Sequence, residues 1–268
     1  MRPWKVATVL GLAGFVLVVL VPFWWIATMS FKTYEQIQFA QSIYVPRPFV
    51  WDNYTSLWQE TRFPLWLRNS AITAVVVTLI TTVVAGLSGY AVARLRFPGR
   101  ESVASLILVL YLVPPALLFI PLYRVLAELG ATNSLMALFL SYPTFTVPFC
   151  TWLLIGFFKA LPVELEEAAL VDGATRLQAL LRVLLPLAAP GIFVALILVY
   201  IPLFSEFATP ALVGGRSGYM LGSLANSLIL EQGDWGAGAA LNFLLLAASA
   251  LVALLAYYLS KLNTTLET

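Results

Sequence analysis

The stretch AITAVVVTLITTVVAGLSGYAVA at residues 71–93 contains no charged side chain. A helix needs about 20 mainly apolar residues to cross the hydrocarbon core of a bilayer, so this stretch is long enough to span it. Five further apolar stretches meet the same requirement, at roughly 6–29, 102–123, 135–158, 191–207 and 239–259. We therefore expect an all-α integral membrane protein with six transmembrane helices, and we expect residues 1–268 to form a single transmembrane domain.

The composition of the whole chain supports the same class of protein. Hydrophobic residues make up 61% of the sequence and charged residues 10%, and the mean hydropathy is +0.91. A soluble domain needs far more polar surface than this. The net charge of +2 gives no reason to expect a nucleic acid partner. The chain has no histidine and a single cysteine, Cys150, so we expect no metal site, no catalytic residue and no intrachain disulfide.

The basic residues predict how the chain is oriented, because lysine and arginine gather on the cytoplasmic side of membrane proteins. With a cytoplasmic N-terminus, that side holds Arg2, Lys5, Arg94, Arg96, Arg100, Lys159, Arg176, Arg182 and Lys261. The outer side then holds Lys32, Arg47, Arg62, Arg68, Arg124 and Arg216. The first set is larger and is concentrated in shorter turns. We therefore predict that both termini lie in the cytoplasm.

Prolines interrupt three of the expected spans. They are Pro114, Pro115 and Pro121 in the third, Pro143 and Pro148 in the fourth, and Pro202 in the fifth. Each proline removes a backbone donor and bends a helix, and bent spans are tolerated where other helices or a watery cavity satisfy the freed carbonyl groups. The pattern favours a transporter or channel over a passive anchor; simple packing kinks are the alternative.

The polar segment 159–186, between the fourth and fifth expected spans, predicts two short cytoplasmic helices. Pro162 suits a first helical position, and the carboxylates that follow it suit the positive end of a helix dipole. Gly173 suits a left-handed C-cap. A second helix then presents Leu177, Leu180, Leu181 and Leu184 on one stripe and ends at Pro186.

We interpret this helix–turn–helix as a docking site for another protein. The alternative is an interfacial helix that lies on lipid headgroups. Glu164, Glu166 and Glu167 argue against that alternative, because the inner leaflet is itself anionic.

These residues also carry a resemblance. Glu167-Ala168-Ala169, then Gly173, then Val183-Leu184-Leu185-Pro186 resembles the EAA motif of ABC importer permeases, with Val183 in place of the isoleucine. The resemblance implies a coupling helix that lodges in a groove on an ATP-binding subunit. The coupling residues that it implies, together with their neighbours, are Glu164, Glu166, Glu167, Ala168, Ala169, Asp172, Gly173, Leu185 and Pro186.

The family implies partners for the chain. Two copies of an ABC ATPase subunit would use the ATP and Mg²⁺, so we expect no cofactor and no enzymatic activity in this chain. In keeping with this, the sequence has no Gly-x-x-x-x-Gly-Lys-Ser/Thr loop. The family also implies a second, homologous permease subunit and an extracytoplasmic solute-binding protein, which would touch the loops around 30–69 and 208–238. The membrane would be the inner membrane of a bacterial or archaeal cell.

Further stretches are similar to sugar-type permeases of the maltose class. They are WDNY at 51–54, GYAVARLRFPG at 89–99, IPLY at 120–123, Leu129-Gly130 and Pro148-Phe149. This similarity implies the smaller, six-span subunit of a heterodimeric permease. Such a subunit would form half of the translocation path for a small polar solute, and we expect a sugar or oligosaccharide.

One stretch departs from that pattern. Sugar-type permeases carry an Asn-Glu pair late in the fifth span, whereas this chain has Ser205-Glu206. The sequence around this pair is more similar to that of permeases for polyamines or ferric iron, so a non-sugar solute is the alternative. Glu206 and Ser205 are our candidates for the solute path; alternatively, the Glu206 carboxylate reaches the outer interface.

Two other classes of function are less compatible with the sequence. A membrane-embedded enzyme would need a histidine or paired acidic residues within the spans, and the chain has neither. A secondary transporter or channel subunit is a more distant alternative, because ion-coupled carriers place acidic residues in mid-membrane and only Glu206 comes near such a position.

Overall fold

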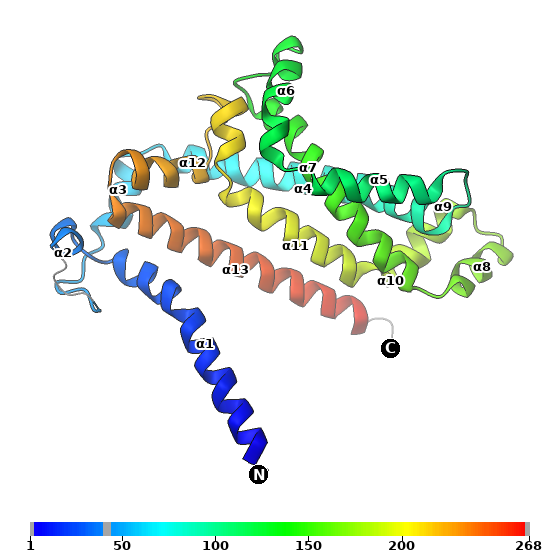
Figure 1. Ribbon diagram of the computed structural model, residues 1–268, viewed down its shortest axis with the longest axis horizontal. Helices are drawn as coiled ribbons and strands as arrows, with labels where there is room; N and C mark the ends of the chain where they lie inside the picture. The colour runs from blue at the N-terminus through cyan, green and yellow to red at the C-terminus, as the bar shows by residue number, and fades with distance from the viewer. Residues whose placement is uncertain (1–2, 40–43, 266–268) are drawn as a thin grey trace. The chain divides into compact units, whose positions relative to one another are not determined.

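The computed structural model describes residues 3–39 and 44–265, and every regular element in those ranges is helical (Figure 1). Arg2 and residues 40–43, which fall in the predicted outer loop around 30–69, lie outside the described residues. The longer helices are α1 (Pro3–Met29), α4 (Phe63–Arg94), α5 (Arg100–Leu112), α6 (Pro115–Glu128), α7 (Leu135–Ala160), α11 (Ala189–Ser205) and α13 (Trp235–Thr265). The shorter ones are α2 (Tyr34–Gln38), α3 (Asp52–Gln59), α8 (Val163–Val171), α9 (Arg176–Ala179), α10 (Leu185–Leu187) and α12 (Leu221–Asn226).

Four helices are long and apolar enough to cross a membrane singly: α1, α4, α7 and α13. Two bent pairs also pass this test. Helix α5 continues into α6 through a bend of 95°, and the segment of α9 and α10 continues into α11 through a bend of 76°. By length and composition, the described residues therefore contain four candidate spans, or up to six if each bent pair crosses once. The number six and the cytoplasmic termini stay predictions.

The sharpest bend falls where two prolines are adjacent. A residue before proline is pushed out of the helical region, so Val113 and Pro114 are both extended, with ψ values of 122° and 127°. The predicted bend in the third span is thereby confirmed at this position. The other interrupting prolines, Pro121, Pro143, Pro148 and Pro202, lie inside helices that continue through them.

The contacts within the chain define two compact units, and the expectation of a single domain is not tested by this division. The first unit comprises Met1–Leu65 and Leu224–Ala248. In it the Asn53 side-chain amide donates to the backbone oxygens of Ser30 and Lys32, at 2.9 Å each. The Tyr54 hydroxyl donates to Ser30 Oγ at 2.8 Å. The WDNY stretch thus holds the chain that leaves α1.

The second unit comprises Trp66–Ser223 and Ser249–Thr268, and it contains both candidate sites. Helix α7 packs against α5 and α11, and the side chains of Leu154 and Phe158 are fully buried in it. Gly191 of α11 lies against α7, where an added Cβ would overlap the ring of Phe157. Glycine is therefore needed at 191 for this helix pair.

Replacing Gly191 tests that packing. We expect Gly191→Ala to reduce the free energy of unfolding by about 1–3 kcal/mol, the usual cost of forcing an extra carbon into a filled contact. The thermal midpoint of the purified protein in detergent, followed by tryptophan fluorescence, measures the effect. Gly156→Ala in α7 is the matched control, because nothing lies within 4 Å of its added Cβ. Equal midpoints for the two variants would contradict the assigned contact.

Candidate functional site

Helix α8 ends in a hydrogen-bonded turn that requires glycine. Gly173 has φ +89°, in the left-handed region. Its N–H donates to Leu170 O at 3.1 Å, and the Ala174 N–H donates to Ala169 O at 3.0 Å, which is the Schellman pattern. The predicted C-cap is confirmed. At the other end of the helix Pro162 stands at the N-cap, one position before the predicted one.

The second helix of the loop begins at a capping box and ends differently from the prediction. The Thr175 hydroxyl accepts from the Gln178 N–H, and the Gln178 side chain accepts from the Thr175 N–H, so a capping box begins α9. The helix then widens into a π-helical stretch, η1 (Leu180–Leu184), and continues as α10. Our prediction that it ends at Pro186 is wrong: Pro186 lies within α10, and the break follows at Ala188.

The predicted leucine stripe is also wrong. Leu180 and Leu184 are buried, whereas Leu177 and Leu181 are 58% and 52% exposed. The stripe assumes the spacing of an α-helix, and the wider π turn changes which side chains share a face. Two leucines are therefore left on the surface of the loop.

The four carboxylates of the loop fall into two groups. Glu164, Glu167 and Asp172 are exposed, whereas Glu166 is 7% exposed. The Glu166 side chain therefore lies inside the protein, although the sequence grouped it with the others. Among the remaining predicted residues, Ala168 is exposed and Ala169, Leu185 and Pro186 are half-buried.

The buried carboxylate of Glu166 meets the end of α4. The Tyr90 hydroxyl donates to Glu166 Oε1 at 2.7 Å, and Arg94 Nε lies 3.9 Å from Glu166 Oε2. The Arg94 Nη2 group also donates to Phe158 O at 2.7 Å and to Leu161 O at 2.6 Å, at the end of α7. Helices α4, α7 and α8 are thus joined at one point.

The second candidate residue, Glu206, lies just beyond α11 and is half-buried. Its Oε2 accepts from the Tyr142 hydroxyl at 2.7 Å. Its Oε1 accepts from the N–H groups of Ala208 and Thr209, at 2.7 Å and 3.1 Å. The carboxylate therefore caps the turn that follows it. The neighbouring Ser205 is exposed, and its hydroxyl lies 3.5 Å from Pro202 O.

Glu206 and Tyr142 border a cavity of about 290 Å³. Its walls come from the α5–α6 bend, α7 and α11, and they are rich in aromatic rings: Tyr111, Phe119, Phe145 and Phe149. Two pairs of these rings contact one another, with centroids 5.2 Å apart for Tyr111 and Phe149 and 6.1 Å apart for Phe119 and Phe145. The site combines apolar ring faces with a carboxylate and hydroxyls.

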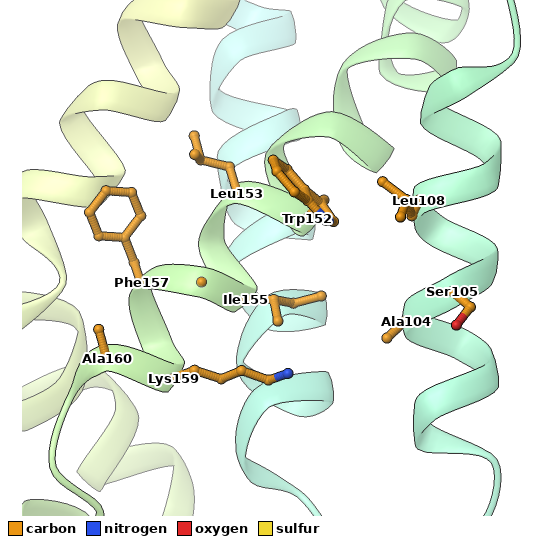
Figure 2. Close-up of a pocket in the computed structure, with 10 residues that line it drawn as sticks. Ala104, Ser105, Leu108, Trp152, Leu153, Ile155, Phe157, Lys159 and Ala160 are labelled. Carbon is orange, nitrogen blue, oxygen red and sulfur yellow. The ribbon is translucent and has the colours of Figure 1, made fainter.

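A larger hollow, of about 650 Å³, lies between α5 and α7. In Figure 2, Trp152 and Leu108 point toward one another across it, and Lys159 stands at its lower end. Its other polar side chain is Ser105. This lining offers apolar contact and lacks the convergent polar groups that hold a solute.

Three residues at these sites were not among the predicted ones: Tyr90, Arg94 and Tyr142. Tyr90 and Arg94 stand four positions apart, and residues at that spacing share a helix face. A tyrosine and an arginine on one face at the end of an apolar run therefore signal a shared polar partner. Nothing in the sequence links Tyr142 to Glu206, because they are distant along the chain.

The chain was compared with known families. The profile of the binding-protein-dependent transport system inner membrane component matches residues 83–264. The chain belongs to this family.

Curated members of this permease family share substantial sequence identity with the chain. The trehalose/maltose transport system permease protein MalG of Thermococcus litoralis is 35% identical over 205 residues, which cover 76% of this chain and 73% of that protein. The sulfoquinovosyl glycerol transport system permease protein SmoH of Agrobacterium fabrum is 34% identical over 216 residues, covering 81% and 75%.

Solved ABC transporters share the permease fold. A permease chain of a bacterial transporter that imports the polysaccharide alginate superposes with a TM-score of 0.71 at 19% identity, covering 97% of this chain and 96% of that one. A chain of the MetNI methionine transporter gives 0.62 at 19% identity, covering 74% and 93%. The chain is an ABC importer permease with this fold.

The Gly173 turn yields a prediction for this permease. A Cβ at 173 would meet nothing within 4 Å, so any cost of substitution is conformational. We expect Gly173→Val to destabilise the α8 turn by about 1–2 kcal/mol, and Gly173→Asn by less, because asparagine tolerates left-handed φ. Limited proteolysis of the loop measures local opening. Equal cleavage rates for Gly173→Val and Gly173→Asn would contradict the requirement for a left-handed φ at position 173.

Proposed function

We propose that this permease forms half of the translocation path of an ABC importer for a sugar or oligosaccharide. Relatives named for trehalose/maltose, sulfoquinovosyl glycerol and diacetylchitobiose support this class of solute. All three are glycosides or oligosaccharides with many hydroxyl groups. These relatives therefore favour a sugar as the solute. A polyamine is the alternative that Ser205-Glu206 suggests.

The proposal that α8 couples the permease to an ATPase rests on the exposed face of this helix. Glu164, Glu167 and Asp172 are exposed there, next to Val171, which is 87% exposed. Exposed apolar side chains rimmed by charge are typical of a contact surface for another protein. We assign this surface to the groove of an ABC ATPase subunit, and we assign ATP and Mg²⁺ to that subunit.

The topology we propose has six spans, with each bent pair crossing the membrane once. Both termini and the α7–α11 loop then lie in the cytoplasm of a bacterial or archaeal cell, and the protein is a multi-pass component of the inner membrane. The apolar lengths of the helices and the distribution of arginine and lysine support this topology.

The assembly we propose contains a second, homologous permease subunit, two ATPase subunits and an extracytoplasmic binding protein. The alginate transporter, whose fold is similar, has been solved in complex with a periplasmic protein that holds an alginate pentasaccharide. The family description itself names transport that depends on a binding protein.

The solute path, in our proposal, passes the aromatic cavity beside Glu206. The flat C–H faces of pyranose rings pack on aromatic rings, and sugar hydroxyls donate to carboxylates. Glu206 Oε1 already accepts from two backbone N–H groups. Oε2 accepts from the Tyr142 hydroxyl and only shares the Thr209 N–H, at 3.2 Å, so Oε2 is the oxygen with room for a further donor. We therefore assign Glu206 two roles, fixing the cavity wall through Tyr142 and accepting a solute hydroxyl.

Charge reversal at Glu167 tests the docking surface. We expect Glu167→Lys to reduce co-purification of the ATPase by roughly tenfold, since an attractive charge becomes a repulsive one at the interface. Tagged permease is isolated from membranes, and the bound ATPase is quantified. Glu128→Lys is the control, because Glu128 is exposed at the end of α6 on the predicted outer side. An intact complex with Glu167→Lys would refute docking through α8.

Neutralising Glu206 tests the solute path. We expect Glu206→Gln to lower uptake of radiolabelled trehalose or maltose by about tenfold, as the loss of one charged hydrogen bond implies, while the complex still assembles. Uptake is measured in proteoliposomes with the full transporter and its binding protein, and Glu128→Gln serves as control. Unchanged sugar uptake, or uptake of spermidine instead, would count against the proposal.

A further inference from the structure

The contacts of Glu166 differ from those of every other carboxylate in the loop. It is the one that is buried, and its two oxygens face Tyr90 and Arg94 of α4, at 2.7 Å and 3.9 Å. The side chains of Arg94 and Glu166 are 5% and 10% exposed. This carboxylate is out of reach of an ATPase that docks on the exposed face, so it serves another purpose.

The connection between α7 and α8 indicates what this purpose is. Leu161 and Pro162 alone connect the two helices, and both are extended, with ψ values of 140° and 136°. No helical hydrogen bond therefore runs from α7 into α8, and Pro162 has no N–H to donate. The direction of α8 relative to α7 must be set by side-chain contacts.

Arg94 supplies the link across this joint. Its guanidinium donates to Phe158 O and Leu161 O, before and at the joint, and its Nε faces Glu166 beyond it. Arginine suits this place because its planar fork presents several donors in fixed directions. The Tyr90 ring also meets the Phe158 ring edge-on, with centroids 6.1 Å apart.

We propose that Tyr90, Arg94 and Glu166 form a transmission clamp, which makes α8 move together with α4 and with the end of α7. The three are positioning residues, and the inference rests on the proposed docking of α8 on the ATPase. When the ATPase displaces α8, the clamp passes the displacement to the two spans. Without the clamp, α8 turns about the joint at Leu161 and Pro162, and ATP is hydrolysed without transport.

The chemistry of the clamp fits transmission better than simple stability. An apolar side chain at 166 would fill the same space and avoid the cost of burying a charge. Apolar contacts let a helix slide or rotate, whereas hydrogen bonds to a carboxylate fix its direction. The buried charge therefore gives α8 a defined orientation.

Removing one hydroxyl tests the clamp with the least disturbance. We expect Tyr90→Phe to lower the number of solute molecules moved per ATP hydrolysed by about tenfold, because a charged hydrogen bond of ordinary strength is lost from the link. The reconstituted transporter, with its binding protein and radiolabelled maltose, is assayed for both uptake and ATPase activity. Tyr200→Phe in α11 is the matched control for deleting a tyrosine hydroxyl.

A double variant separates transmission from folding. We expect Glu166→Ala to lower the transport-to-ATP ratio further, and Tyr90→Phe combined with Glu166→Ala to be no worse than Glu166→Ala alone, because both break the same bond. Additive losses would overturn the clamp. A lower thermal midpoint with an unchanged transport-to-ATP ratio in Tyr90→Phe would also overturn it, since that result indicates a merely structural role.

A distance measurement checks the movement itself. Arg96, two residues beyond the end of α4, and Val171, at the end of α8, are exposed, and the native Cys150 is buried. Spin labels at 96 and 171 therefore report on the end of α4 and on α8. We expect the label distance to stay the same in nucleotide-free and ATP-trapped transporter, and to change between these states in Tyr90→Phe. A change in the wild-type background would show that α4 and α8 move separately.

The clamp and the docking proposal fail in different ways. If docking is correct and the clamp is not, Glu167→Lys releases the ATPase while Tyr90→Phe keeps the wild-type transport-to-ATP ratio. If docking itself is wrong, Glu167→Lys retains the ATPase.

Discussion

The guanidinium of Arg94 holds together the end of the second unit where three helices meet. The last carbonyl groups of a helix have no partner within it, and those near the end of α7 would otherwise be left without donors. Arg94 Nη2 donates to Phe158 O in the last turn of α7 and to Leu161 O just beyond it, and Arg94 Nε lies 3.9 Å from the buried Glu166. One side chain therefore closes α7, fixes the start of α8 and ties both to α4. The placement of the loop surface depends on this set of contacts.

The prolines show which bends a sequence predicts and which it does not. Val113 and Pro114 each precede a proline, and two consecutive residues that avoid the helical region end a helix wherever they occur. Single prolines such as Pro143 and Pro148 lack this reinforcement, and α7 continues through both. Whether a single proline breaks a span depends on neighbouring helices, which the local sequence does not specify.

The candidate sites also contain some features that the local sequence predicts and others that it does not. The turn at Gly173 was predictable, because left-handed φ is a local requirement that favours glycine. The burial of Glu166 was not, because it depends on Tyr90 and Arg94 across the fold. Glu206 was singled out as a charge near a span, but its cap on the next turn and its bond from Tyr142 are known only from the structure.

Helix α7 connects the two sites physically. Its C-terminal end, at Phe158, is held by Arg94, and Tyr142, sixteen positions earlier, borders the aromatic cavity. At 1.5 Å per residue the two points are about 24 Å apart along one continuous helix. Pro143 and Pro148 lie between them, and each removes a backbone hydrogen bond from the helix. A displacement that enters α7 at Phe158 therefore reaches the cavity through the part of the helix that bends most easily, next to Tyr142 and its bond to Glu206.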